Sequence, residues 1–161
     1  MHNTPPFETD WFSKGVFPLM GVLFSILAGA AMSVQGVMNT RLSEKIGLHE
    51  SNLIVQGTAF VLSALVLWFW GKGDFKLLPQ VPWVYWLGGV LGVVITLTVM
   101  MAIGAMSPTV AISIILVSQL LVAALIDAFG WMGAEKVPFT WRQYGGAALM
   151  IAGVLLFKWK S

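Results

Sequence analysis

Long apolar stretches with almost no charge are the feature that most constrains the fold of this 161-residue chain. A helix crosses the hydrocarbon core of a membrane with about 20 apolar residues. Five stretches of about that length follow one another, at residues 16–38, 51–70, 82–104, 108–129 and 141–157. The sequence therefore predicts an all-α membrane protein, a bundle of five transmembrane helices formed by residues 16–161. Residues 1–15 are expected to be a tail at the membrane interface.

The composition excludes a soluble or a disordered chain. Hydrophobic residues make up 58% of the sequence and charged residues 10%, whereas a soluble domain has about 25% charged residues. Strands of a membrane β-barrel alternate apolar and polar residues, which the run from Ile112 to Val117 does not do. A secretory signal peptide needs a basic start, but here Glu8 and Asp10 stand against Lys14. Multi-pass insertion in the inner membrane is the remaining expectation.

Several classes of function lack the residues that they need. The chain has no cysteine, and both of its histidines lie outside the predicted spans. We therefore expect no metal, no cofactor and no catalytic group, so the protein is not predicted to be an enzyme. Its nine lysines and arginines are dispersed along the chain, so nucleic acid is not an expected partner.

Tryptophans gather on one side of the predicted bundle, whereas positive charges do not. With the N-terminal tail on side A, that side holds Trp11, Trp68, Trp70, Trp83, Trp86, Trp131 and Trp141, and side B holds Trp159. Side A carries Lys14, Lys72, Lys76, Lys136 and Arg142; side B carries Arg41, Lys45, Lys158 and Lys160. An excess of Lys and Arg on one side sets orientation, and five against four is almost no excess. Either a single loop residue or an insertion partner sets the orientation, or the chain inserts both ways and pairs with an inverted copy.

Small residues recur at a spacing of four in two of the spans. Such spacing places them on one helix face, where they let helices approach closely. The set consists of Gly21, Ser25, Gly29 and Ser33 in the first span, and Gly88 and Gly92 in the third. We interpret them as helix-packing positions, with a role in substrate binding as the alternative.

Polar side chains share a depth inside the predicted membrane. Polar groups are costly in lipid and normally face a bundle interior or a cavity. The layer contains Gln35, Asn39, Gln56, Thr96, Thr98, Ser113 and Gln119. Hydrogen bonding between helices explains any one of these residues as well as a site does, but the shared depth favours a wet cavity. Gln35, Asn39, Thr96, Ser113 and Gln119 are therefore predicted to bind a small-molecule substrate.

Asp127 is the one acid within a predicted span. It lies two residues from the side-A end of the fourth span, where a carboxylate can still reach water. It shares a helix face with Gln119 and Ala123. We include Asp127 among the predicted substrate-binding residues, with a merely interfacial position as the alternative.

Two motifs resemble those of a known transporter family. The first is Gln-Gly-Val-Met-Asn-Thr-Arg-Leu at residues 35–42. The second is Ser-Gln-Leu at residues 118–120, followed by Leu-Ile-Asp-Ala-Phe-Gly at residues 125–130. Together with residues 83–92, they resemble the YdcZ-type five-helix branch of the drug/metabolite transporter superfamily.

The resemblance implies a ten-helix transport unit built from two inverted five-helix halves. In each half, the first, third and fourth helices line the central cavity. A chain of five helices then supplies one half, and an antiparallel homodimer in the lipid bilayer completes the unit.

The combined interpretation is a small multi-pass transporter of an organic metabolite that works by alternating access. One alternative is a cation or multidrug exporter in which Asp127 is the coupling acid. The other is a subunit that performs no transport and packs against a larger membrane assembly.

Overall fold

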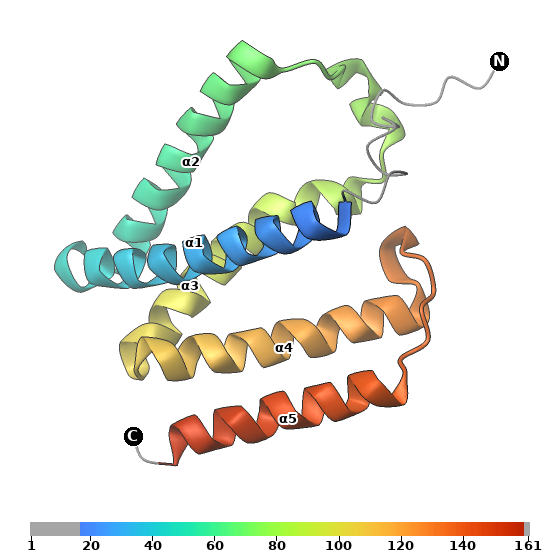
Figure 1. The fold of residues 1–161 in the computed structure, drawn as a ribbon. Helices are drawn as coiled ribbons and strands as arrows, with labels where there is room; N and C mark the ends of the chain where they lie inside the picture. The colour runs from blue at the N-terminus through green and yellow to red at the C-terminus, as the bar shows by residue number, and fades with distance from the viewer. Residues whose placement is uncertain (1–16, 160–161) are drawn as a thin grey trace. The chain divides into compact units, whose positions relative to one another are not determined.

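The computed structural model describes residues 17–159, which form helices and their connections without a strand (Figure 1). The tail at residues 1–15 and Lys160 lie outside the described residues. The α-helices are α1 (Phe17–Ile46), α2 (Leu48–Trp70), α3 (Gly88–Ala105), α4 (Pro108–Phe129) and α5 (Trp141–Lys158). Short 3-10 helices occupy the connections on side A: η2 (Phe75–Gln80), η3 (Trp83–Leu87) and η4 (Trp131–Gly133).

Within residues 17–159, four helical stretches are long and apolar enough to cross a membrane. They are Leu19–Ile46, Leu48–Trp70, Trp83–Ala105 and Pro108–Phe129. The predicted all-α membrane bundle is confirmed. α5 is not among the four, because it begins with the polar run Trp-Arg-Gln-Tyr and ends at Lys158. That α5 crosses the membrane stays a prediction.

The chain divides into two compact units inside α1, residues 1–35 and 36–161. The described part of the first unit is a single helical segment. Its Ser25 and Ser33 hydroxyls donate to the carbonyls of Gly21 and Gly29, 2.8 and 2.9 Å away. The hydroxyls are thus satisfied within their own helix, and the packing role of this stripe stays a prediction.

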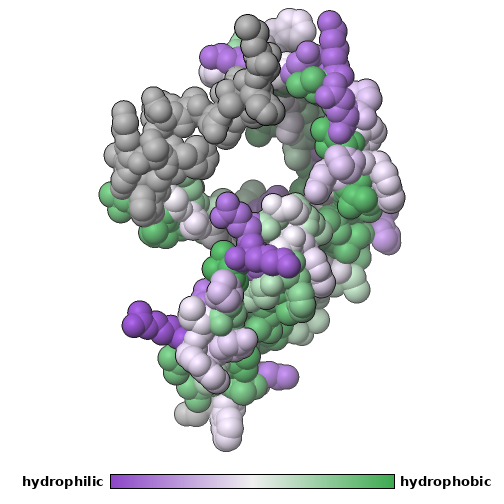
Figure 2. All heavy atoms as spheres, turned by 90° about the vertical axis from the view of Figure 1, so that its right-hand side faces the viewer, coloured by the Kyte–Doolittle hydropathy of each residue, from purple (hydrophilic) through white to green (hydrophobic). Residues whose placement is uncertain are grey.

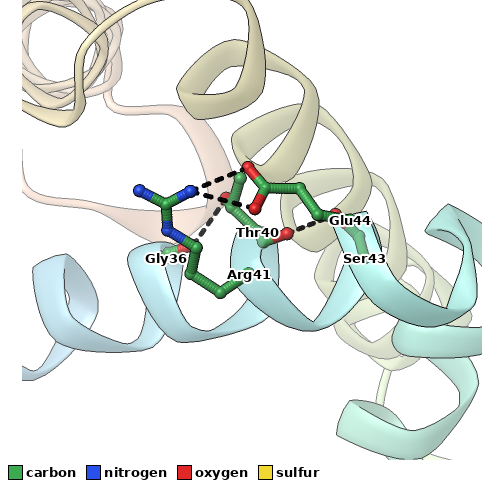
Figure 3. A network of polar contacts seen from close by, with 5 residues as sticks. All are labelled: Gly36, Thr40, Arg41, Ser43 and Glu44. Carbon is green, nitrogen blue, oxygen red and sulfur yellow. Dashed lines mark hydrogen bonds and ion pairs between the residues drawn. The ribbon is translucent and has the colours of Figure 1, made fainter.

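α1 is longer than its apolar stretch, which corrects the predicted loop at residues 40–50. The helix continues to Ile46, and Gly47 alone joins it to α2. Arg41 pairs with Glu44 at 2.9 Å, one turn further on (Figure 3). The Thr40 and Ser43 hydroxyls donate to backbone carbonyls of the same helix. Hydropathy marks where a helix leaves the hydrocarbon core, but these pairs let it continue into the interface.

Gly47 makes the sharp turn between α1 and α2. Its φ of 102° lies in the left-handed region, which favours glycine. Its amide donates to the Ser43 carbonyl, and its own carbonyl accepts from the amide and hydroxyl of Ser51. A single residue therefore reverses the chain with its backbone groups paired.

α3 begins later than predicted, at Gly88 instead of residue 82. Residues 83–87 form η3, which follows Pro82. Aromatic and β-branched residues in this run are weaker helix formers. The Tyr85 hydroxyl donates to the Met132 carbonyl at 3.4 Å, so η3 reaches η4 across side A.

α4 has well-defined signals at both ends. Ser107 caps its start by accepting from the Val110 amide, and Pro108 takes the first position of the helix. Gly130 ends it in the left-handed conformation, at φ 65°. The short turn at residues 106–107 holds α3 and α4 next to each other as a hairpin.

The tightest packing of the second unit lies at side B, around the turns at Gly47 and residues 106–107. There α1 and α2 contribute Gly36, Thr40 and Ser51, and α3 and α4 contribute Met100, Ile103, Val110 and Ala111, all buried. α4 also packs against α5, where Ala147 is buried (Figure 1). Towards side A the helices are exposed.

Large apolar side chains dominate the exposed surface. Trp68 is 85% exposed and Phe60 74%. On the face drawn in Figure 2, hydrophobic residues cover much of the described surface, and hydrophilic ones form a few separate groups. Such a surface is unfavourable in water and suits contact with lipid or with another helical chain.

We expect the contact between α1 and α3 to be sensitive to volume at Gly36. A Cβ atom there would lie 2.9 Å from Ile103 Cδ1 and 3.2 Å from Val99 Cγ1. Gly36→Val should lower the free energy of unfolding by about 1–3 kcal/mol, since overpacking a tight contact forces neighbours to move. Gly57→Val is the matched control, because a Cβ at Gly57 meets nothing within 4 Å. Equal losses in a denaturation assay would contradict this contact.

Labelling of single cysteines should show whether α5 crosses the membrane. The chain has no native cysteine, and Lys45, Lys72, Glu135 and Trp159 are exposed. Among chains of one orientation, Lys45→Cys and Trp159→Cys should label from one side, and Lys72→Cys and Glu135→Cys from the other. Labelling of position 159 together with position 135 would instead mean that α5 stays on side A.

Candidate functional site

A cleft of about 550 Å³ lies between α3 and α4. It begins beside the buried core at side B and extends towards side A. From α3 it is lined by Ile95, Thr98, Val99 and Ala102; from α4 by Ile114, Ile115, Ser118, Gln119, Val122, Ala123 and Ile126. Pockets of this size with mostly apolar walls and a few polar groups are typical of small-molecule sites.

The α4 residues that line the cleft follow the helical repeat. Ile114, Ser118, Val122 and Ile126 recur every four residues, and so do Ile115, Gln119 and Ala123. Residues four apart share a face, so two adjacent rows of α4 form one wall of the cleft. On α3, Ile95 and Val99 are four residues apart, and so are Thr98 and Ala102. This pattern was available in the sequence, but apolar rows of this kind are also the ordinary pattern of lipid-facing or packed helices.

Gln119 is the predicted site residue that lines the cleft. It is exposed at the middle of α4, and its carboxamide makes no hydrogen bond to another part of the chain within residues 17–159. An amide without a partner is costly in lipid, so this position favours a cleft that holds water or a ligand.

The other predicted residues of α3 and α4 lie outside the cleft. Thr96 accepts a hydrogen bond from Gln56 of α2 at 3.3 Å and donates to the Gly92 carbonyl at 2.8 Å. Gly92 faces the same glutamine, whose Nε2 lies 3.8 Å from a Cβ built there. The Ser113 hydroxyl donates to the Thr109 carbonyl at 2.7 Å.

Asp127 is exposed in the last turn of α4 and does not line the cleft. Its backbone carbonyl accepts from the Val137 amide at 3.0 Å, so the chain folds back over the helix end. A carboxylate near a helix C-terminus is disfavoured by the helix dipole. The position fits contact with water at the membrane boundary.

The two predicted residues of α1 fall in different units. Gln35 is exposed in the first unit. Asn39 belongs to the second unit, where it is half-buried next to the buried Thr40, outside the cleft. A Cβ at Gly104 of α3 would lie 3.9 Å from Thr40 Cγ2, so this part of α1 is held against the end of α3.

Three polar residues of interest were not among the predicted site residues. Thr98 and Ser118 line the cleft. Asn52, beside the fully buried Ser51 at the start of α2, has a buried Oδ1 without a hydrogen-bond partner in the described part of the chain. Asn52 and Gln56 are four apart and share a face of α2. That spacing was the one available signal for Asn52.

The cleft contains no charged side chain, and its chemistry is limited to binding. Among the described residues, no group of three or more His, Cys, Asp or Glu side chains could hold a metal ion. The cleft is open on one side, since Ile95 and Val122 are more than half exposed. Its walls can take up an apolar body, and the Gln119 amide and the oxygens of Thr98 and Ser118 can form hydrogen bonds with it. Helices that are long and apolar enough to cross a membrane, with an uncharged cleft between two of them, indicate a multi-pass membrane protein that can bind small solutes.

Comparison with known families identifies the chain more closely. The family model described as "Putative inner membrane exporter, YdcZ" matches residues 20–156. The chain belongs to this family, so the resemblance seen in its motifs is confirmed. It is a multi-pass transporter of the inner membrane, and membership of a transport family supports the prediction that it is not an enzyme. No curated protein and no solved structure matches the chain.

Proposed function

We propose that the protein carries a small organic metabolite across the inner membrane by alternating access, as an antiparallel homodimer. The observation that carries this proposal is the α3–α4 cleft with the unpaired Gln119 amide at the middle of α4. The family's description favours export as the direction.

The pairing of two inverted copies rests on three observations. Positive charge is nearly balanced between the two sides, with five against four Lys and Arg residues. Tryptophans gather on side A, although membrane proteins usually have aromatic belts at both interfaces. The second unit also exposes large apolar side chains along α2, α3 and α4. An inverted partner would supply the second belt and cover part of this surface.

A cation exporter with Asp127 as coupling acid is the alternative within transport. It needs the carboxylate to reach the bound solute. Asp127 is exposed at the side-A end and lies outside the cleft lining. The uncharged lining therefore favours a metabolite without net charge over a cation.

An assembly subunit without transport is the alternative from another class. It predicts that the small-residue stripes matter and that the polar residues do not. Such a subunit would use the exposed Gln119 amide only for a structural hydrogen bond to a partner helix, so the effect of a Gln119 variant on ligand binding separates the two functions.

Ligand binding should depend on the amides at positions 119 and 39. A thermal-shift screen of metabolites against the purified protein provides the ligand, since a compound at 100 times its Kd adds about 2.7 kcal/mol of stability. We expect Gln119→Leu to reduce the shift strongly. Asn39→Leu should do the same if α1 lines the central cavity, as the family resemblance implies, although Asn39 lies outside the α3–α4 cleft. The crosslinked dimer fraction should be unchanged in both. Asp127→Asn should retain it unless a cation or proton is handled. Gln80→Leu, an exposed amide in η2, is the control. An unaltered shift in both test variants would mean that these amides are structural.

Locking the orientation should reveal the inverted pair. The exposed Glu44, Ile46 and His49 lie on side B, and changing them together to Lys should give one orientation. Transport of the ligand from the screen should then be lost. Co-expression with a chain locked the other way, carrying Gly73→Lys, Gln80→Lys and Glu135→Lys, should restore it. Full transport by a population locked in one orientation would contradict the antiparallel dimer.

A further inference from the structure

The hydrogen-bonding groups of the cleft are not equally available. The Ser118 hydroxyl donates to the Ile114 carbonyl at 3.0 Å. The Thr98 hydroxyl lies 2.8 Å from the Val94 carbonyl and 3.1 Å from that of Ile95. Both hydroxyl hydrogens are thus engaged within their own helices, and only oxygen lone pairs face a ligand.

Gln119 is therefore the side chain of the cleft that can donate. Its carboxamide carries two N–H donors and a carbonyl acceptor, and none of them is engaged within the described residues. A ligand group that both donates and accepts can satisfy this amide, while a group that only accepts or only donates leaves part of it unpaired.

The remaining walls are aliphatic. They supply no charge and no aromatic ring, since they consist of Ile95, Val99, Ala102, Ile114, Ile115, Val122, Ala123 and Ile126. An ion placed here would lose its hydration without a counter-charge, and a cation would find no ring face to compensate. The lining along α4 from Ile114 to Ile126 extends over about 18 Å, with Gln119 in its middle part. An elongated, uncharged body fits these walls.

We propose that the cleft binds an uncharged solute with an aliphatic body and one hydrogen-bonding head, such as a primary amide or an alcohol. The head pairs with the Gln119 carboxamide, and the aliphatic part lies along the α3 and α4 walls. This inference rests on the proposed transport function and adds the class of its ligand.

Three probes that differ only in their head group test the class. Octanamide, octylammonium and octanoate, each carrying a diazirine on the chain, are photolysed with the full chain in lipid nanodiscs. Labelled residues are identified by mass spectrometry, and unlabelled octanamide serves as competitor. We expect saturable, competed labelling of residues 95–102 and 114–126 by the amide probe. Half-saturation by the two ionic probes should require at least about tenfold higher concentrations, because a charge is disfavoured in the lining.

Two variants test the geometry against matched controls. Gln119→Leu should raise the half-saturation concentration of the amide probe about tenfold, the loss expected for one ligand hydrogen bond. Gln80→Leu should leave it unchanged. Ala123→Trp fills the cleft and should abolish labelling there, whereas Ala59→Trp on the exposed face of α2 should not. Because each pair shares the same bilayer, partitioning of the probe into lipid cancels in the comparison.

The outcomes separate this inference from the proposed function. Stronger labelling of the cleft by an ionic probe than by the amide overturns the ligand class. Uncompeted labelling spread equally over α2, α3, α4 and α5 means that lipid chains occupy the cleft, and overturns the inference as well. If the metabolite from the thermal-shift screen is charged and still depends on Gln119, transport at this cleft stands and the inference on ligand class fails.

Discussion

The close contact of α1 with α3 at Gly36 and Thr40 is the constraint on which the rest of the second unit depends. Gly36 has no side chain to separate the helices, and the Thr40 hydroxyl is paired with the Gly36 carbonyl at 2.8 Å (Figure 3). The contact therefore buries no unpaired hydroxyl at a depth where one would be costly. Around it the helices converge on Met100 and Ala111, which are 2% and 1% exposed. The cleft begins where this packing ends.

The position of the cleft follows from where the helices are fixed. Two short turns, at Gly47 and at residues 106–107, join α1 to α2 and α3 to α4 at side B, where Gly36 and Thr40 of α1 lie against α3. α3 and α4 leave this end as a hairpin and have fewer buried contacts towards side A. A fixed end and a less packed length are suited to alternating access, because a helix pair can change its spacing without losing its core.

Hydropathy predicted the helices, and depth predicted the polar layer, but neither predicts the direction of a side chain. Thr96 and Thr98 have nearly the same depth, yet residues two apart point to different sides of a helix. Thr96 faces Gln56 of α2, and Thr98 faces the cleft with α4. Thr96 thus makes a structural hydrogen bond on one face of α3, and Thr98 lines the candidate site on another face. The prediction of a loop at residues 40–50 was wrong for a related reason. Hydropathy indicates whether a segment lies in lipid or in water, but it does not indicate whether its backbone is helical.

In the proposed inverted pair, the depth of a residue in the membrane decides whether its two copies can come close to each other. In this respect Gln119 differs from Asn39 and Asp127. Inversion carries a residue near one membrane face to the opposite face, so the two copies of Asn39 or of Asp127 end far apart. A residue at the middle of its helix keeps its depth, and two copies of Gln119 can face a single space. A carboxamide can pair with another carboxamide as well as with a solute. In the proposed dimer, the two amides could therefore satisfy each other in the empty cavity and exchange that pair for the ligand's head group, so neither state leaves a bare polar group in the membrane.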